Sequence, residues 1–221
     1  MDRRFLEDTA LHNPELFKAN LQFNAGHCFL PQPKAMLDSL PLQAADLWQD
    51  RYFRHAAVSD PAAAGWWGFE HENCRFALLG KETLLKLCRR FSASVLGERI
   101  AHVIAREPQA QLKAKLGPEL YRYAISRGRY QSGFLGKTFL SHLGPGSVAD
   151  QFDMLTEVVL GLITDGWSDE LDEMLGLPKQ GSELEAAPAI ALGSEHHAAF
   201  RFMLKKILLR EVAPEWAPCF D

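Results

Sequence analysis

The amino-acid sequence predicts an all-α fold, a single irregular bundle of several helices, on the strength of three observations. Apolar residues after Gly80 recur at three- and four-residue spacing, which places them on one side of a helix. Residues typical of helix ends, such as serine, glycine and proline, flank these apolar stretches. No segment alternates apolar and polar residues with comparable strength, as a half-buried strand would. We therefore expect helices along the chain and no sheet.

The chain is long enough to bury a substantial core. It has 221 residues, of which 47% are hydrophobic, as is ordinary for a globular protein. We expect one domain over residues 1–221, with an irregular helical part at 1–80. The helical core, the C-terminal helix and an aromatic tail are expected at 81–221. The charged first residues and the short longest apolar run, residues 158–163, predict neither an export signal nor a membrane span.

The cysteines are scattered along the chain and form no CxxC pair, which predicts neither a disulfide framework nor a four-thiolate zinc site. We expect free thiols in a reducing cytosol. The residues are Cys28, Cys74, Cys88 and Cys219.

Prolines and glycines interrupt the first eighty residues, so short helices joined by loops are expected there. Residues 14–23 and 36–53 still show helical spacing of their apolar residues. The aromatic cluster Trp66, Trp67 and Phe69 carries a large apolar surface, which favours a place in the core. An anchor for a partner protein is the alternative interpretation.

The strongest helical pattern follows Gly80. Its apolar residues share one side of a helix and direct the basic residues Lys86, Arg89 and Arg90 elsewhere. Gly97 then marks a break or a close contact between helices. The apolar side consists of Leu84, Leu87, Cys88, Phe91 and Val95.

A second apolar stripe begins with Ile100, Val103 and Ile104 and is expected to end near Pro108. The pair Gly117 and Pro118 predicts the end of one helix and the start of the next, because glycine favours the position after a helix and proline its first turn. That next helix is expected to run toward Gly128.

The clearest helix start lies at Ser147, which could cap a long helix together with Asp150. The helix is expected to end at Gly166, and Ser168 is expected to cap another helix that begins with acidic residues. Its predicted apolar side consists of Val148, Phe152, Leu155, Val159 and Leu162.

A final helix is predicted from about residue 195 to 212 and is ended by Pro214. Its inward residues are expected to be Phe200, Met203, Leu204, Ile207 and Leu208.

No stretch carries a recognisable catalytic motif. Residues 133–138 end like a phosphate-binding P-loop, but Gln131 stands where the motif needs glycine and no buried strand precedes it. We therefore expect no catalytic residue, no cofactor and no metal. Side chains that could ligate a metal occur without the spacing of a zinc site: His71, Glu72, Cys74, His196 and His197.

Charge is unevenly distributed along the chain. Residues 81–141 hold twelve Lys or Arg against four Asp or Glu, whereas residues 142–195 hold eleven acids against one lysine. A solvated surface is the plain interpretation of the basic segment, and a docking surface for an acidic partner is the functional one. The acidic segment would repel nucleic acid or an anionic membrane, which favours a protein partner. The basic residues concerned are Lys113, Lys115, Arg122, Arg127, Arg129 and Lys137.

Several stretches resemble the SctK/YscK family of type III secretion proteins. In the centre of the chain these are residues 84–90, 95–97, 100–106 and 116–125. At the end they are residues 202–209 with Val212, Pro214, Glu215, Trp216 and Phe220, which resemble the family's C-terminal helix and aromatic tail. The resemblance covers less than half of the chain and contains no active-site signature.

The resemblance implies a cytoplasmic adaptor of the secretion sorting platform, held at the inner membrane through its protein partners. Such an adaptor joins the SctQ-like pod protein to the cytoplasmic domain of the SctD-like ring protein, and it has no catalytic residues. The expected partner-binding residues are Lys113, Lys115, Arg122, Arg127, Arg129, Trp216 and Phe220.

Two other classes of function stay open at the level of sequence. A secretion chaperone or another helical protein-binding module would show an exposed apolar groove and form a tight homodimer. An enzyme could assemble a site from distant residues such as His71, Cys74 and His102.

Overall fold

The computed structural model describes residues 9, 11–27, 68–69, 71–177 and 192–220. These residues form helices joined by turns and contain no strand, which confirms the predicted all-α class. No helix among them is both long and apolar enough to span a bilayer. The predicted helix at 36–53 and the residues Trp66 and Trp67 lie outside the described residues.

The chain divides into two compact units. Unit 1 comprises Met1–Leu79, Trp167–Leu177 and Trp216–Asp221, and unit 2 comprises Gly80–Gly166 and Pro178–Glu215. Each unit therefore draws on both halves of the sequence. The expectation of a single domain stays a prediction, and each unit is described by itself.

Unit 1 gathers short helices around aromatic side chains. The rings of Phe23 and Phe69 pack edge to face with their centres 5.3 Å apart, and the ring centres of Phe76 and Phe220 are 4.9 Å apart. Phe220, in the aromatic tail, is 1% exposed. The described helices of this unit are α2 (Pro14–His27), α5 (Glu72–Arg75), η3 (Phe76–Leu79), α12 (Asp169–Met174) and α14 (Ala217–Phe220).

Hydrogen bonds to main-chain carbonyls join the distant segments of unit 1. The Arg75 guanidinium donates to the carbonyls of Phe69 and Cys219, at 3.0 Å and 3.2 Å. The indole of Trp167 donates to the carbonyl of Asn73 at 3.2 Å. The predicted cap at Ser168 is confirmed, since its hydroxyl accepts the N–H of Leu171.

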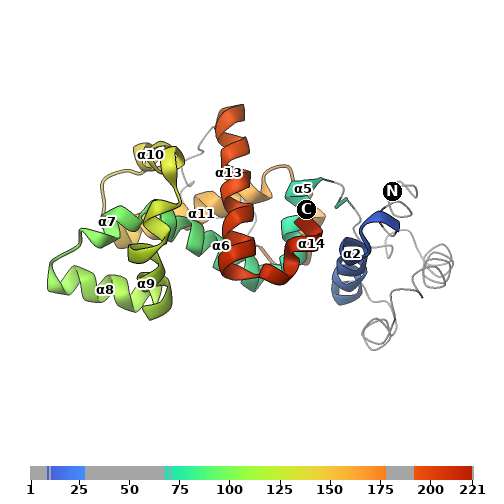
Figure 1. Ribbon diagram of the computed structural model, residues 1–221, viewed down its shortest axis with the longest axis horizontal. Helices are drawn as coiled ribbons and strands as arrows, with labels where there is room; N and C mark the ends of the chain where they lie inside the picture. Colours follow the sequence, from blue (N-terminus) through green and yellow to red (C-terminus); the bar gives the residue numbers. More distant parts are fainter. Residues whose placement is uncertain (1–8, 10, 28–67, 70, 178–191, 221) are drawn as a thin grey trace. The chain divides into compact units, whose positions relative to one another are not determined.

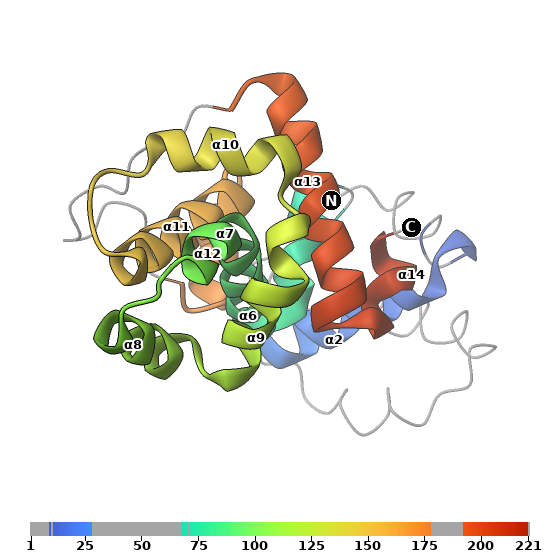
Figure 2. The same cartoon turned by 60° about the vertical axis from the view of Figure 1, so that its left-hand side comes forward.

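Unit 2 is organised by α6 (Gly80–Val95), which packs along α11 (Val148–Thr164) and is crossed by α13 (Ser194–Ile207), as Figure 1 shows. Two further helices, α8 and α10, lie on opposite sides of α7 (Figure 2). The remaining elements of the unit are α7 (Gly97–Ala101), α8 (Arg106–Leu116), α9 (Pro118–Ser126), η4 (Gly128–Tyr130), α10 (Gly133–His142) and η5 (Leu208–Val212).

The apolar side predicted for residues 84–95 is buried throughout, and it forms the interior of unit 2. At its centre the ring of Phe91 packs edge to face against the rings of Phe139 and Phe200, with distances between ring centres of 5.4 Å and 5.1 Å. The neighbouring Cys88 is fully buried, and this burial raises the pKa of its thiol to about 12. The predicted inward side of the last helix is confirmed as well, because all five of its residues are buried.

Three predicted features of the connections in unit 2 are confirmed. The hydroxyl of Ser147 accepts the N–H of Asp150 at 3.1 Å and so caps α11. Gly117 ends α8 with φ of 79°, a conformation that favours glycine, and Pro118 is the first residue of α9. Gly97 is a close contact, since a Cβ there would lie 2.7 Å from the carbonyl oxygen of Ala124.

The prediction of a second apolar stripe is wrong beyond its first residue, Ile100, which is buried. Helix α7 ends at Ala101, and the side chain of Ile104 is 87% exposed. Pro108 lies in the first turn of α8 instead of at the end of a helix. Proline is tolerated there because the N–H groups of a first turn have no partner within the helix. The proline therefore signalled a helix start.

Candidate protein-docking surface

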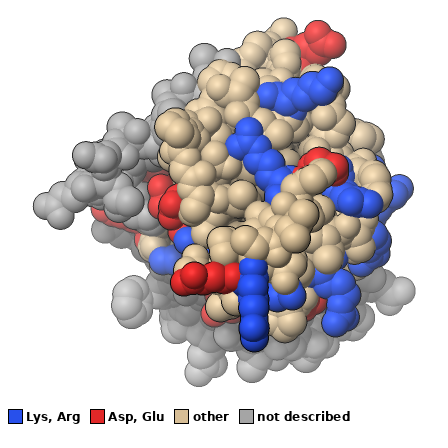
Figure 3. Space-filling view, turned by 90° about the vertical axis from the view of Figure 1, so that its left-hand side faces the viewer, with Lys and Arg blue, Asp and Glu red and all other residues tan. Residues whose placement is uncertain are grey.

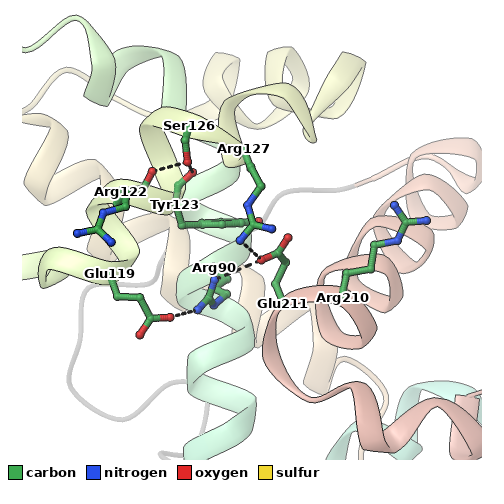
Figure 4. Close-up of a pocket in the computed structure, with 8 residues that line it drawn as sticks. All are labelled: Arg90, Glu119, Arg122, Tyr123, Ser126, Arg127, Arg210 and Glu211. Carbon is green, nitrogen blue, oxygen red and sulfur yellow. Dashed lines mark hydrogen bonds and ion pairs between the residues drawn. The ribbon is translucent and has the colours of Figure 1, made fainter.

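A groove lined by charged side chains opens on unit 2 between α6, α9 and η5. Its volume is about 400 Å³. Four arginines and two glutamates line it, which leaves a formal excess of two positive charges. We call it the arginine groove, and its lining residues are Arg90, Glu119, Arg122, Tyr123, Ser126, Arg127, Arg210 and Glu211 (Figure 4).

Glu211 is the centre of the ion pairs in the arginine groove. Its Oε2 lies 3.1 Å from Nη2 of Arg127 and 3.7 Å from Nη1 of Arg90. The side chain of Glu211 is only 8% exposed, so it is shielded from water and salt. A carboxylate so far removed from water needs these cationic partners, because an unpaired buried charge is costly.

The end of the last helix places Glu211 there. After Ile207 the chain continues as one turn of π-helix, in which the N–H of Ala213 donates to the carbonyl of Leu208 at 2.8 Å. Such turns insert one residue and redirect the side chains that follow, and they are frequent at functional sites. Here the turn carries two groove residues, Arg210 and Glu211.

Arg90 links three parts of the groove. Its guanidinium lies 4.9 Å from the centre of the Tyr123 ring, and it forms ion pairs with Glu119 and Glu211. The Tyr123 hydroxyl lies 2.8 Å from the hydroxyl oxygen of Ser94, and burial raises the pKa of the phenol. The ring of Tyr123 thus contacts the Arg90 guanidinium, while the Tyr123 hydroxyl forms its hydrogen bond inside the unit.

Arg122 and Arg210 differ from the other two arginines of the groove. Within the described residues, neither guanidinium has an ion pair or a hydrogen bond. Figure 4 shows them on the two outer sides of the central ion pairs, pointing away from Glu211. Their charges are therefore open to a partner.

The predicted basic residues do not form one uniform face. Lys115 pairs with Asp153, and Arg127 pairs with Glu211. Arg129 lies with its guanidinium 4.6 Å from the centre of the Tyr130 ring and donates to the Tyr130 hydroxyl. Acidic side chains and an aromatic ring thus already contact three of the basic residues that the sequence indicated as candidates for docking.

Lys113 and Lys137 are exposed outside the arginine groove. The ammonium of Lys113 lies 5.3 Å from the centre of the Tyr121 ring and donates to Gln109 at 3.2 Å. On the face of unit 2 that carries α7, α8 and α10, Lys and Arg side chains are spread widely with fewer acids among them (Figure 3). Of the predicted residues, the groove brings together Arg122 and Arg127.

The two aromatic residues of the tail belong to unit 1. Phe220 packs inside that unit against Phe76, and Trp216 is half-buried. Their assignment to partner binding stays a prediction.

Sequence reasoning missed six residues that line the groove: Arg90, Glu119, Tyr123, Ser126, Arg210 and Glu211. The spacing along α6 did place Arg90 away from the apolar side, and this was the one local indication that Arg90 could belong to a surface site. Glu211 lies in a nearly neutral part of the chain, so nothing near it in sequence indicated that it would meet Arg90.

The residues considered for other chemistry are dispersed. Within the described parts of the chain, no group of three or more His, Cys, Asp or Glu side chains is placed to hold a metal ion. The ring of His196 packs 5.6 Å from that of Phe134, and burial raises the pKa of the Cys74 thiol. Residues 133–138, which end like a P-loop, lie in helix α10.

In comparisons with known proteins, no family model, no curated protein and no solved structure matches this chain.

Proposed function

We propose that this protein is a cytoplasmic adaptor of a type III secretion sorting platform and that it docks a partner protein on the arginine groove of unit 2. In this role it links the SctQ-like pod protein to the cytoplasmic domain of the SctD-like ring protein, and it lies at the inner membrane through these contacts.

The resemblance of the central helices and the aromatic tail to the SctK/YscK family supports the adaptor role. The observation that carries docking on unit 2 concerns Arg122 and Arg210, on the outer sides of the ion pairs around Glu211. Neither guanidinium has an ionic partner in the part of the chain that the structure describes. Unpaired surface cations of this kind steer an acidic partner and select it.

The proposal is tested by co-purification with the two partners. Tagged full-length protein is expected to capture both the SctQ-like and the SctD-like protein of the same organism. The variant Arg122→Glu with Arg210→Glu should lose one of them and retain the other, because reversing both charges repels an acidic surface.

A matched control carries the same change of charge outside the groove. Arg106→Glu with Arg201→Glu alters two exposed cations of unit 2 that lie on α8 and α13. This variant should capture both partners as the wild type does. Capture of neither partner by the wild type would overturn the adaptor role, and equal capture by all three proteins would overturn docking on the groove.

A further inference from the structure

The arginine groove has ion pairs at its centre and exposed cations at its sides. Glu211 is held by Arg90 and Arg127 and is nearly inaccessible, so an incoming acid is not expected to replace it. Arg122 and Arg210 are exposed and have no ionic partner within the described residues. A ligand therefore meets two separate positive sites across a centre that is already neutralised.

Arg127 adds a third point of contact. Its side chain is 69% exposed, and its ion pair with Glu211 engages only Nη2. A guanidinium has five N–H donors, so the others remain available to a ligand. The planar fork of arginine matches a carboxylate in a bidentate manner, which gives such a contact direction as well as charge.

The acids that line the groove indicate the class of ligand. Nucleic acid presents a dense and regular row of phosphates, which would bring negative charge close to Glu119 as well as to the arginines. A peptide carries discrete carboxylates that can reach Arg122 and Arg210 while its uncharged residues pass Glu119, which is 83% exposed. A volume of about 400 Å³ accommodates a few side chains of an extended or helical segment.

We infer that the arginine groove binds an acidic peptide segment of a partner protein, with one carboxylate on Arg122, one on Arg210 and further hydrogen bonds from Arg127. This inference rests on the proposed function in one respect, that the partner is a protein. It adds the chemistry by which the groove recognises that partner. Glu211 serves as the internal counterion that keeps Arg127 and Arg90 in place.

The test measures binding of a designed peptide to the full-length protein. A fluorescein-labelled peptide of alanine with six spaced glutamates is titrated with protein, and the fluorescence anisotropy gives Kd. We expect binding that weakens as salt rises and that is lost for the matching peptide with six glutamines. Arg122→Gln with Arg210→Gln should raise Kd about tenfold or more, since it removes two charge-assisted contacts.

The control variant Arg106→Gln with Arg201→Gln removes the same charge outside the groove and should change Kd by less than about twofold. Circular dichroism of both variants establishes that they are folded; should the groove pair unfold, Arg122→Lys with Arg210→Lys takes its place, and a raised Kd is expected because lysine lacks the bidentate fork. Equal weakening by the groove and control pairs, or no binding to the wild type, overturns the inference.

Other ligands are distinguished in the same assay. Tighter binding of a single-stranded oligonucleotide or of phosphatidylserine vesicles that depends on Arg122 and Arg210 would overturn the assignment to an acidic peptide. A dimer that is seen by light scattering and abolished by the groove variant would do so too, because it would identify a second copy of this chain as the ligand. Capture of both partners without peptide binding would leave the adaptor role standing and refute only the inference.

Discussion

The two sides of helix α6 are stabilised in different ways. On one side Phe91 is fully buried between Phe139 and Phe200, in contact with rings from two other helices. On the other side the adjacent residue Arg90 faces Tyr123, Glu119 and Glu211 in the arginine groove. The apolar side depends on many non-directional contacts, whereas the charged side depends on a few directed ones. Substitutions on the two sides should therefore differ in size and in their response to salt.

The largest effect is expected on the apolar side. Phe91→Ala removes a ring at the centre of the unit 2 interior and should lower the free energy of unfolding by about 3–5 kcal/mol, because the cavity cannot collapse fully. Urea denaturation followed by circular dichroism measures the change. Phe202→Ala, at a position that is 72% exposed, is the matched control and should change it by less than about 0.5 kcal/mol. Similar losses for both would mean that α6 is not central to the fold.

The second largest effect is expected at Gly97, where two stretches of main chain lie in close contact. A Cβ at Gly97 would lie 2.8 Å from Cα of Arg129 and closer still to the Ala124 carbonyl, and these main-chain atoms cannot move aside as a side chain can. Gly97→Val should therefore lower the free energy of unfolding by about 3 kcal/mol. Thermal unfolding of Gly144→Val provides the reference, because no atom lies within 4 Å of a Cβ at that exposed position. A Gly97→Val protein as stable as the wild type would show that Gly97 does not lie this close to the main chain of Ala124 and Arg129.

The charged side of α6 is tested by Glu211→Gln, which keeps the shape of the side chain and removes its charge. We expect a loss of about 2 kcal/mol, because Arg90 and Arg127 then lack their shared buried carboxylate. Glu119→Gln is the matched control on the same Arg90, and at 83% exposure it should cost less than about 1 kcal/mol. Urea denaturation at low and high salt compares the two. Equal costs would mean that burial does not set the strength of these ion pairs.

The smallest effect concerns the helix that packs along α6. Ser147→Ala removes the hydroxyl that caps α11 and should lower the free energy of unfolding by about 1 kcal/mol. The same serine donates to the Asp150 carboxylate, a hydrogen bond that lowers the pKa of this exposed acid. The pKa of Asp150, followed by NMR, should consequently rise toward its usual range in the variant. An unchanged stability and an unchanged pKa would show that the cap does not form in solution.

Much of unit 2 could be predicted from local patterns. The apolar spacing of α6 and of the last helix, the cap at Ser147 and the boundary at Gly117 were all predicted from neighbouring residues. Helix α10 was not predicted, because Gly133 and Gly136 interrupt the apolar spacing of residues 133–142. Pro108 was interpreted as a stop although it lies in a first turn, since the same residue occurs at both helix boundaries.

The candidate site could be predicted only in part. Arg122 and Arg127 were singled out by the density of basic residues, and both line the groove. Charge density could not reveal that Arg127 already has an acidic partner or that Arg210 belongs to the same surface. These facts depend on the end of the last helix lying beside α6 and α9.

The sequence by itself determined the helical class of this protein, the side of α6 that is buried and several helix ends, because helical period and capping act over a few residues. Tertiary structure alone decided which charges are neutralised and which remain open. Ion pairing requires two side chains to come within a few ångströms, and Arg90, Arg127 and Glu211 meet only when three separate elements pack together.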